Sequence, residues 1–260
     1  MARLMSRVIR RVKRLIYAPA IEISATGGLL TLGSEYGSWT FEPSADLQNS
    51  IIVSCGLGED ASFDVEFASR FHAKVILVDP TPRALRHFEE IQERLGKPLE
   101  QSYVEGGKQP ATSYDLSEIT PGQLILEPFA LWVEETRLRF FAPPNPDHVS
   151  HSIVNYQNGY SMDSPYIEVP AITPEVLLGR HGLSKIALMK MDIEGAEIQV
   201  IPHLLEKAIF PRQILVEFDE MSVPSGRSKK KIEDTDSLLR QAGYVCRHYN
   251  GIANFLYVRG

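Results

Sequence analysis

The feature that most constrains the fold is an alternation of apolar runs with helical patterns between residues 50 and 258. Apolar runs of strand length are followed by segments in which apolar residues recur at the spacing of a helix face. Some of these segments carry end signals, since Thr81 and Pro82 are typical of a helix start and Gly96 of a helix end. The alternation predicts an α/β fold, with helices on both faces of a doubly wound, mostly parallel sheet.

The expected elements follow one another along the chain. The expected strands are Ser50–Cys55, Lys74–Asp79, Leu124–Leu131, Ile186–Met191 and Ile214–Phe218, followed by Tyr244–Arg247 and Ala253–Val258. The expected helices are Asp60–Phe71, Thr81–Leu95, Pro174–His181, Gly195–Lys207 and Ser228–Ala242. Between residues 21 and 41, glycines interrupt short apolar segments, which predicts small strands and turns. Residues 109–122 and 142–163 are expected to be long loops, either walls of a binding site or plain surface.

The composition is that of an ordinary globular protein. Of 260 residues, 43% are apolar and 23% are charged, which excludes a disordered, collagenous or coiled-coil chain. No apolar run reaches the length of a membrane span, and no signal peptide is recognised. Cys55 and Cys246 are too few for a disulfide framework and match no zinc pattern, so we expect two small buried thiols in a cytoplasmic protein.

Charge is distributed unevenly along the chain. The net charge is −6, but residues 1–16 carry six basic residues and no acidic one. The acidic remainder argues against nucleic-acid binding, which needs basic surface to neutralise phosphates. Within the basic segment, apolar residues recur at helical spacing and predict an amphipathic helix over residues 1–18. This helix would lie peripherally on an anionic membrane, dock a partner, or pack on its own domain. The expected division is this helix, an extension over 19–49 and one domain over 50–260.

A glycine turn after the first long strand predicts a nucleotide-type cofactor. Gly56 and Gly58 let the backbone turn tightly and let a ligand approach closely, while Asp79 ends the next strand and can accept hydrogen bonds from two ribose hydroxyls. These features indicate an adenosine-bearing cofactor. The run Gly56-x-Gly58-x-x-Ala61, with Asp79 21 residues after Gly58, also matches the dinucleotide fingerprint, so a nicotinamide cofactor is an alternative. A glycine turn without any ligand is another.

Carboxylates gather at the carboxyl ends of the next two expected strands. Asp192 and Glu194 follow the strand that ends at Met191, and Glu217 and Asp219 come at the end of the strand after it. Half-buried carboxylates at this edge are costly unless they bind a cation, a metal or hydroxyl groups. Asp192, Glu217 and Asp219 together would suit Mg²⁺ as oxygen ligands. In the plainer interpretation Glu194 caps the following helix, and Glu197 is solvated.

Several blocks, in the same order, resemble the FkbM-type S-adenosylmethionine-dependent methyltransferases. The blocks are Leu32–Trp39, Ser54–Asp60 with Ser62–Asp64, Val78–Pro80, Phe129–Leu131, Ser150–Asn155 and, as the most specific of them, Leu188–Glu197. The resemblance implies the Rossmann-like methyltransferase sheet, with a final antiparallel hairpin supplied by Tyr244–Val258.

The resemblance also implies roles for residues at the cofactor. Gly56 and Gly58 would approach its methionine part, Asp79 would hold the ribose hydroxyls, and Ala130 would lie near the adenine. Asp192 would stand beside the transferable methyl group.

The chain departs from the family pattern at the methionine end of the cofactor. Many relatives carry an acid where this chain has Ser54, and Asn-x-Gly where it has Gly58-Glu59-Asp60. We place Ser54 in the cofactor site, and Asp60 becomes the candidate for the cofactor's amino group.

The expected reaction is methyl transfer to oxygen. Asp192 is the first candidate for the base that accepts the hydroxyl proton, with Glu194 or Glu217 next. His148 and His151 are rivals on a loop, and together with Asn155 they are candidate substrate-binding residues. The resemblance suggests a hydroxyl on a saccharide or glycoconjugate as the acceptor. The alternatives are a non-catalytic binding protein with the methyltransferase fold and an NAD(P)-dependent oxidoreductase, although the latter leaves the carboxylates at 192–197 unexplained.

Overall fold

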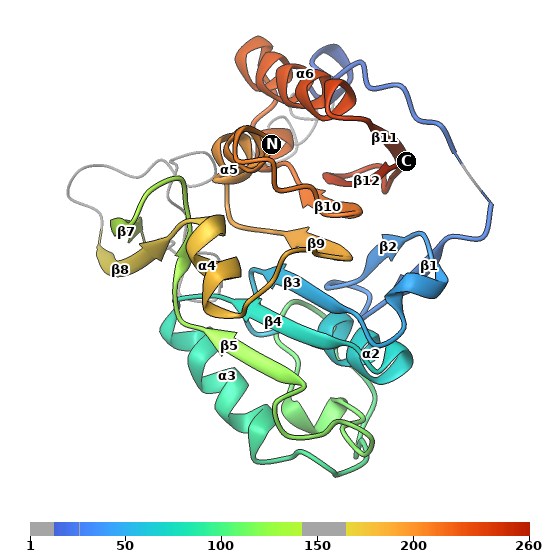
Figure 1. Cartoon of the computed structure of the whole chain (residues 1–260), viewed down its shortest axis with the longest axis vertical. Coiled ribbons are helices and arrows are strands. Elements are labelled where there is room, and N and C mark those ends of the chain that lie inside the picture. Colours follow the sequence, from blue (N-terminus) through green and yellow to red (C-terminus); the bar gives the residue numbers. More distant parts are fainter. Residues whose placement is uncertain (1–12, 26, 142–164) are drawn as a thin grey trace, which may run out of the picture.

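The computed structural model describes residues 13–25, 27–141 and 165–260 and contains one large sheet (Figure 1). Its strand order is β11-β12-β10-β9-β3-β4-β5. These strands are β3 (Ile51–Cys55), β4 (Lys74–Val78), β5 (Leu124–Glu127), β9 (Leu188–Met191), β10 (Gln213–Glu217), β11 (Tyr244–Tyr249) and β12 (Asn254–Arg259). The helices are α2 (Ser62–Phe71), α3 (Pro82–Gln92), α4 (Pro174–Arg180), α5 (Glu197–Glu206) and α6 (Gly226–Gln241). The expected mixed α/β fold with a large, mostly parallel sheet is confirmed.

The order of the strands reverses in the middle of the sheet. From β3 the chain proceeds outward through β4 to β5, then returns to the other side of β3 and adds β9 and β10. Because β3 and β9 are neighbours whose chain continuations lead in opposite directions, a crevice opens beyond their carboxyl ends. Within this sheet β12 runs antiparallel to both β10 and β11, so it is the one reversed strand among the described seven.

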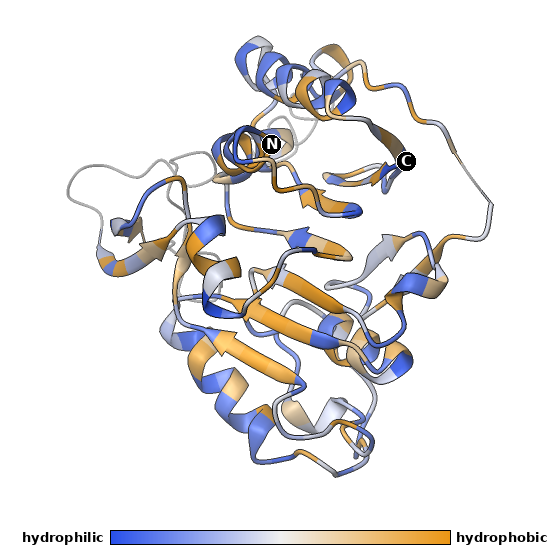
Figure 2. Ribbon diagram, viewed as in Figure 1, coloured by the Kyte–Doolittle hydropathy of each residue, from blue (hydrophilic) through white to orange (hydrophobic). Residues whose placement is uncertain are grey.

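Alternate side chains of the central strands enter two separate apolar clusters. Ile52, Val75 and Leu77 pack on one face with the apolar residues of α2 and α3. Val53 and Ile76 pack on the other face with those of α4, α5 and α6. The strands are therefore apolar on both faces, whereas α6 is mostly hydrophilic (Figure 2). This explains why the sequence shows continuous apolar runs and no alternation in these strands.

Two small strands precede the main sheet, in the region where the sequence predicts short strands and turns. They are β1 (Leu30–Leu32) and β2 (Trp39–Phe41), which pair antiparallel; the 3-10 helix η1 (Ala45–Leu47) follows them. The ring of Phe41 is fully buried, and its centroid lies 5.2 Å from that of Phe67 and 6.1 Å from that of Phe63. In addition, the Gln213 side chain accepts from the backbone N–H of Glu42 and donates to its carbonyl oxygen, at 2.9 and 2.7 Å. This segment therefore shares the core of the main sheet.

The expected strand Leu124–Leu131 is two strands in different sheets. Pro128 has no N–H to donate and separates β5 from β6 (Ala130–Leu131). The latter joins β7 (Thr136–Phe141) and β8 (Tyr166–Ile172) in a second sheet of order β6-β8-β7. Neither β7 nor β8 was predicted from the sequence. Two further 3-10 turns complete the described elements, η2 (Ala111–Ser113) and η3 (Asp219–Ser222).

Of the basic segment at the N-terminus, residues 1–12 lie outside the described residues. Residues 13–16 are helical, with Leu15 and Ile16 exposed. The chain then runs along α6, where the Ala20 N–H donates to Glu233 Oε1 at 2.9 Å. None of the described helices is long and apolar enough to cross a membrane. Peripheral membrane contact through residues 1–18 stays a prediction.

Both cysteines are free and buried, as expected. Burial raises the pKa of the Cys55 thiol to about 12 and that of the Cys246 thiol to about 11. Both thiols are therefore protonated and unreactive near neutral pH.

The position of Phe41 predicts that residues 19–49 are part of the folding unit. Phe41→Ala removes a ring from a packed aromatic cluster and leaves a cavity, so we expect a loss of about 3–5 kcal/mol in the free energy of unfolding. Denaturant unfolding, followed by circular dichroism, measures this loss. The exposed Thr31→Ala on β1 is the control and is expected to cost less than about 1 kcal/mol. A single transition with an unchanged midpoint in Phe41→Ala would contradict the prediction.

Candidate active site

A cavity of about 460 Å³ lies at the carboxyl ends of the central strands. Loops that follow β3, β4, β9 and β10 supply most of its lining, and the second sheet contributes Ala130, Leu131 and Phe140. The loop between β1 and β2 and the turn between β11 and β12 complete the wall. The cavity therefore occupies the crevice that the reversal of strand order predicts.

The loops after β3 and β9 are in close contact at the floor of the cavity. A Cβ atom on Gly56 would lie 1.9 Å from the backbone oxygen of Asp192, so only glycine fits at this point. The Asp192 N–H donates to the Cys55 carbonyl at 3.1 Å, and the Lys190 ammonium donates to the Gly56 carbonyl at 2.7 Å. Gly56 is thus required by packing between the loops. Gly58 differs, because its φ is +54° and no atom lies within 4 Å of a Cβ built there.

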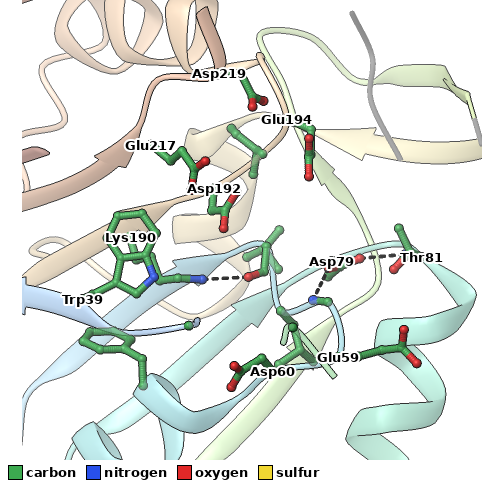
Figure 3. A pocket seen from close by; sticks show the side chains of 18 of the residues that line it. Trp39, Glu59, Asp60, Asp79, Thr81, Lys190, Asp192, Glu194, Glu217 and Asp219 are labelled. Carbon is green, nitrogen blue, oxygen red and sulfur yellow. Dashed lines mark hydrogen bonds between the residues drawn. The ribbon is translucent and has the colours of Figure 1, made fainter. Parts of the chain in front are cut away.

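Asp79 directly follows β4 and is held by two backbone groups. Its Oδ2 accepts from the N–H of Gly58 at 2.9 Å, and its Oδ1 accepts from the N–H of Thr81 at 2.8 Å (Figure 3). Thr81 in turn caps α3, since its side chain accepts from the Ala84 N–H. Asp79 is therefore fixed at the edge of the cavity, with both oxygens still able to accept further hydrogen bonds.

The carboxylates after β9 and β10 gather on one side of the cavity. The side chains of Asp192, Glu194, Glu217 and Asp219 surround its upper part in Figure 3. Burial, together with the charges of Asp192 and Asp219, raises the pKa of Glu217 to about 9. Burial also raises the pKa of Asp192, while the Lys190 ammonium opposes that rise. Near neutral pH, Glu217 is therefore protonated while the cavity is empty.

Lys190 is the one basic residue among the described residues that line the cavity. Its side chain is buried on β9, with the ammonium 5.5 Å from the centroid of the Trp39 ring. Besides Asp192 and Glu217, its charge lowers the pKa of the buried Asp64 carboxyl group. Lys190 is thus the counter-charge for several buried acids.

A strained turn after β9 directs Glu194 toward the cavity. Glu194 has a φ of +56°, which is uncommon for a residue with a side chain. The Glu197 carboxylate accepts from the N–H groups of Ile193 and Gly195, at 2.6 and 2.9 Å, and holds this turn. Glu197 is 0% exposed, so the interpretation that it is solvated is wrong. Its burial and the nearby Asp219 raise its pKa well above the usual range.

Other predicted site residues occupy different environments. Asp60 lines the cavity, but its oxygens accept from the Ser34 hydroxyl at 2.6 Å and the Ser62 N–H at 2.9 Å. Ser54 is fully buried beside Asp64 and does not line the cavity, so its position gives no support to a cofactor role.

The predicted loop residues cannot be placed in the same way. His148, His151 and Asn155 lie outside the described residues. Within the described part of the chain, no three histidine, cysteine or acidic side chains are arranged to hold a metal ion, so the Mg²⁺ cluster of Asp192, Glu217 and Asp219 is not found.

Two parts of the cavity wall were not predicted from the sequence. The turn between β11 and β12 is fixed by Asn250, whose side-chain oxygen accepts from three N–H groups, those of Ile252, Ala253 and Asn254. The second part is Tyr36, which is 64% exposed at the rim, with its ring against Gly107. The Asn250-Gly251 pair predicts a turn, but nothing in the sequence indicates that this turn borders the cavity.

Comparison with known families gives one informative result. The model of the methyltransferase FkbM domain matches residues 32–246, most of the chain. This region holds every cavity-lining segment described above except the turn at 250–254. No curated protein and no solved structure matches the chain.

The burial of Glu217 predicts how the stability of the empty protein depends on pH. Its carboxyl group loses the proton near pH 4.5 when the chain is unfolded, but only near pH 9 in the folded protein. Between these values the unfolded state binds fewer protons, so the free energy of unfolding falls as the pH rises. Glu217→Gln should flatten this fall, and thermal unfolding from about pH 5.5 to about pH 8.5 measures it.

A matched control is available on α5. The Glu206 side chain is 74% exposed, so Glu206→Gln should leave the pH dependence as it is in the unaltered protein. Equal slopes in all three proteins would show that the Glu217 carboxyl group ionises with its ordinary pKa.

Proposed function

The chain belongs to the FkbM methyltransferase family, and on this premise we propose that it is an S-adenosylmethionine-dependent O-methyltransferase. The proposed acceptor is a hydroxyl group of a saccharide or glycoconjugate. The observation that carries the cofactor assignment is the position of Asp79. Both of its oxygens are oriented by backbone N–H groups at the edge of a cavity above the point where strand order reverses.

The residues present fit this cofactor. Asp79 retains acceptor capacity for two ribose hydroxyls. Phe129 and Ala130 supply apolar surface for the adenine, and the open space above Gly58 leaves room for the methionine part. When bound, the cofactor supplies a methyl group on a sulfonium, which becomes a neutral thioether when an acceptor oxygen takes that methyl group. Asp192 provides negative charge on the side of the cavity where a sulfonium is best accommodated.

The proton of the acceptor hydroxyl needs a base, and we assign this role to Asp192. Both Asp192 and Glu217 face the cavity, but they share a site in which like charges oppose each other. Glu217 is protonated near neutral pH, which leaves Asp192, close to Lys190, as the ionised member of the pair. Asp192 accepts the proton while Glu217 and Glu194 orient the acceptor through hydrogen bonds. Lys190 and Glu197 act as positioning residues, since Lys190 donates to the Gly56 carbonyl in the loop that packs on Asp192 and Glu197 accepts from the N–H of Ile193.

The first prediction concerns the cofactor. In calorimetric titrations we expect S-adenosylhomocysteine to bind and NAD and NADP not to bind. Asp79→Ala should weaken that binding by at least about tenfold, because buried hydrogen bonds to a charged group are lost. Asp234→Ala on the exposed face of α6 is the control and should bind normally. Binding of NAD or NADP alone would make the chain an oxidoreductase and would refute the proposal.

The second prediction separates an enzyme from a non-catalytic binding protein. With radiolabelled S-adenosylmethionine and a panel of saccharides, the unaltered protein should transfer the label, and Asp192→Asn should lower transfer by about 10²-fold or more. The affinity of Asp192→Asn for S-adenosylhomocysteine should stay within a few-fold of normal, since this thioether carries no sulfonium. Undiminished transfer in Asp192→Asn would show that another residue is the base.

A further inference from the structure

We infer that the protein docks on an anionic membrane through a surface that adjoins the cavity. This docking surface is defined by three segments: the N-terminal helical turn at 13–16, residues 223–227 at the start of α6, and the β11–β12 turn at 250–254. The inference goes beyond the proposed function, since it concerns a surface outside the catalytic groups and does not depend on the identity of the cofactor or the acceptor.

The three segments of the docking surface are neighbours in space. Tyr17 follows the helical turn, and its ring lies 3.9 Å from a Cβ built on Gly226, so the turn lies against the start of α6 (Figure 1). Burial raises the pKa of Tyr249 and the charge of Arg14 opposes this rise, so the guanidinium lies near the end of β11. The Tyr249 hydroxyl in turn donates to the Ile252 carbonyl at 3.2 Å.

This surface carries the most exposed large aliphatic side chains of the described part of the chain. Leu15, Ile16 and Ile252 are 80%, 62% and 60% exposed, whereas the next, Leu99, is 50% exposed. Leu99 follows α3, which packs on the opposite face of the sheet from α6. Single exposed apolar side chains are ordinary, but three of them on neighbouring segments are typical of an interaction surface.

Basic residues lie among these apolar side chains and identify the partner. Lys13, Arg14 and Arg227 are exposed on the same surface, although the whole chain has a net charge of −6. Residues 1–12, which lie outside the described residues, add four arginines and no acidic residue directly before the helical turn. Apolar side chains set among cations match the interface of an anionic membrane. A second copy of the chain is a poorer match, because a two-fold dimer would bring the same cations together.

The acidic residues near this surface do not cancel its charge. Glu233 and Asp234 on α6 form ion pairs with Lys229 and Lys230, with N–O distances of 3.7 and 2.8 Å. Glu220, in η3, is fully buried and therefore presents no carboxylate to a membrane. The positive charge of residues 13, 14 and 227 is thus left for the lipid.

Docking in this orientation brings the cavity close to the lipid. Ile252 both lines the cavity and is largely exposed, so it lies where the cavity opens. Ser222 and Asn250 also line the cavity, and they adjoin or belong to the docking surface. The docked protein would therefore hold this edge of its cavity at the membrane surface.

The first experiment measures binding of the full chain to vesicles by sedimentation at low salt. Vesicles of equal parts phosphatidylglycerol and phosphatidylcholine should bind the protein at least about tenfold more tightly than phosphatidylcholine alone, and added salt should weaken this binding. The double variant Arg14→Glu with Leu15→Asp should bind about tenfold or more weakly than the unaltered protein. The matched control, Lys97→Glu with Leu99→Asp, makes the same change of charge and apolarity at exposed positions after α3 and should bind normally.

The second experiment tests the orientation. Cys55 and Cys246 are buried, so a cysteine introduced at an exposed position can be labelled selectively with an environment-sensitive fluorophore. On anionic vesicles the emission of a label at Ile252→Cys should shift to shorter wavelength, while that of a label at Leu99→Cys should stay unchanged. Binding without a shift at Ile252→Cys would mean that residues 1–12 alone hold the protein, and would overturn the inference.

Three other results would overturn it as well. They are the absence of binding to anionic vesicles, equal binding by the two double variants, and a dimer that only Arg14→Glu with Leu15→Asp disrupts. Circular dichroism shows whether each variant is folded. A protein that docks as described but fails to bind S-adenosylhomocysteine would refute the proposed function and leave this inference standing, so the two failures are distinguishable.

Discussion

The site depends on the contact between two loops at the centre of the sheet. The loop after β3 passes so close to the loop after β9 that residue 56 can carry no side chain, and hydrogen bonds from Asp192 and Lys190 join the two loops. Each loop delivers one half of the site: Gly58 and Asp60 on one side, Asp192 and Glu194 on the other. Because the backbones are locked together, the distance between the two halves of the site is fixed by the sheet and not by mobile side chains.

This arrangement buries several acidic side chains, and their burial is unfavourable in free energy. Asp64, Asp192, Glu197 and Glu217 all have raised pKa values because burial disfavours their ionised forms. Lys190 offsets part of this cost, and the two N–H groups held by Glu197 offset another part. Burial of these acids thus lowers the free energy of unfolding of the empty protein as the pH rises.

The central α/β pattern could be predicted from the sequence because the strands are apolar on both faces and α3, α4 and α6 begin with side-chain caps. Gly56, Asp79 and Asp192 were identified for the same reason: each ends or follows a recognisable strand. The second sheet was missed, since β7 mixes Arg137 and Arg139 with apolar residues and Pro128 divides the strand before it. Glu197 was misjudged because its burial depends on the strained turn at Glu194, which helix periodicity does not reveal.

The reversed strand explains how the end of the chain reaches the site. Since β12 lies between β10 and β11 and runs against both, β11 is parallel to β9 and β10. The carboxyl end of β11 therefore lies at the same edge of the sheet as Asp192 and Glu217, and the turn at 250–254 must border that side of the cavity. Had β11 been paired directly to β10 as an antiparallel neighbour, this turn would lie at the opposite edge. The turn falls outside the family match at 32–246. It nevertheless belongs to the cavity wall, because the directions of β10, β12 and β11 place it there.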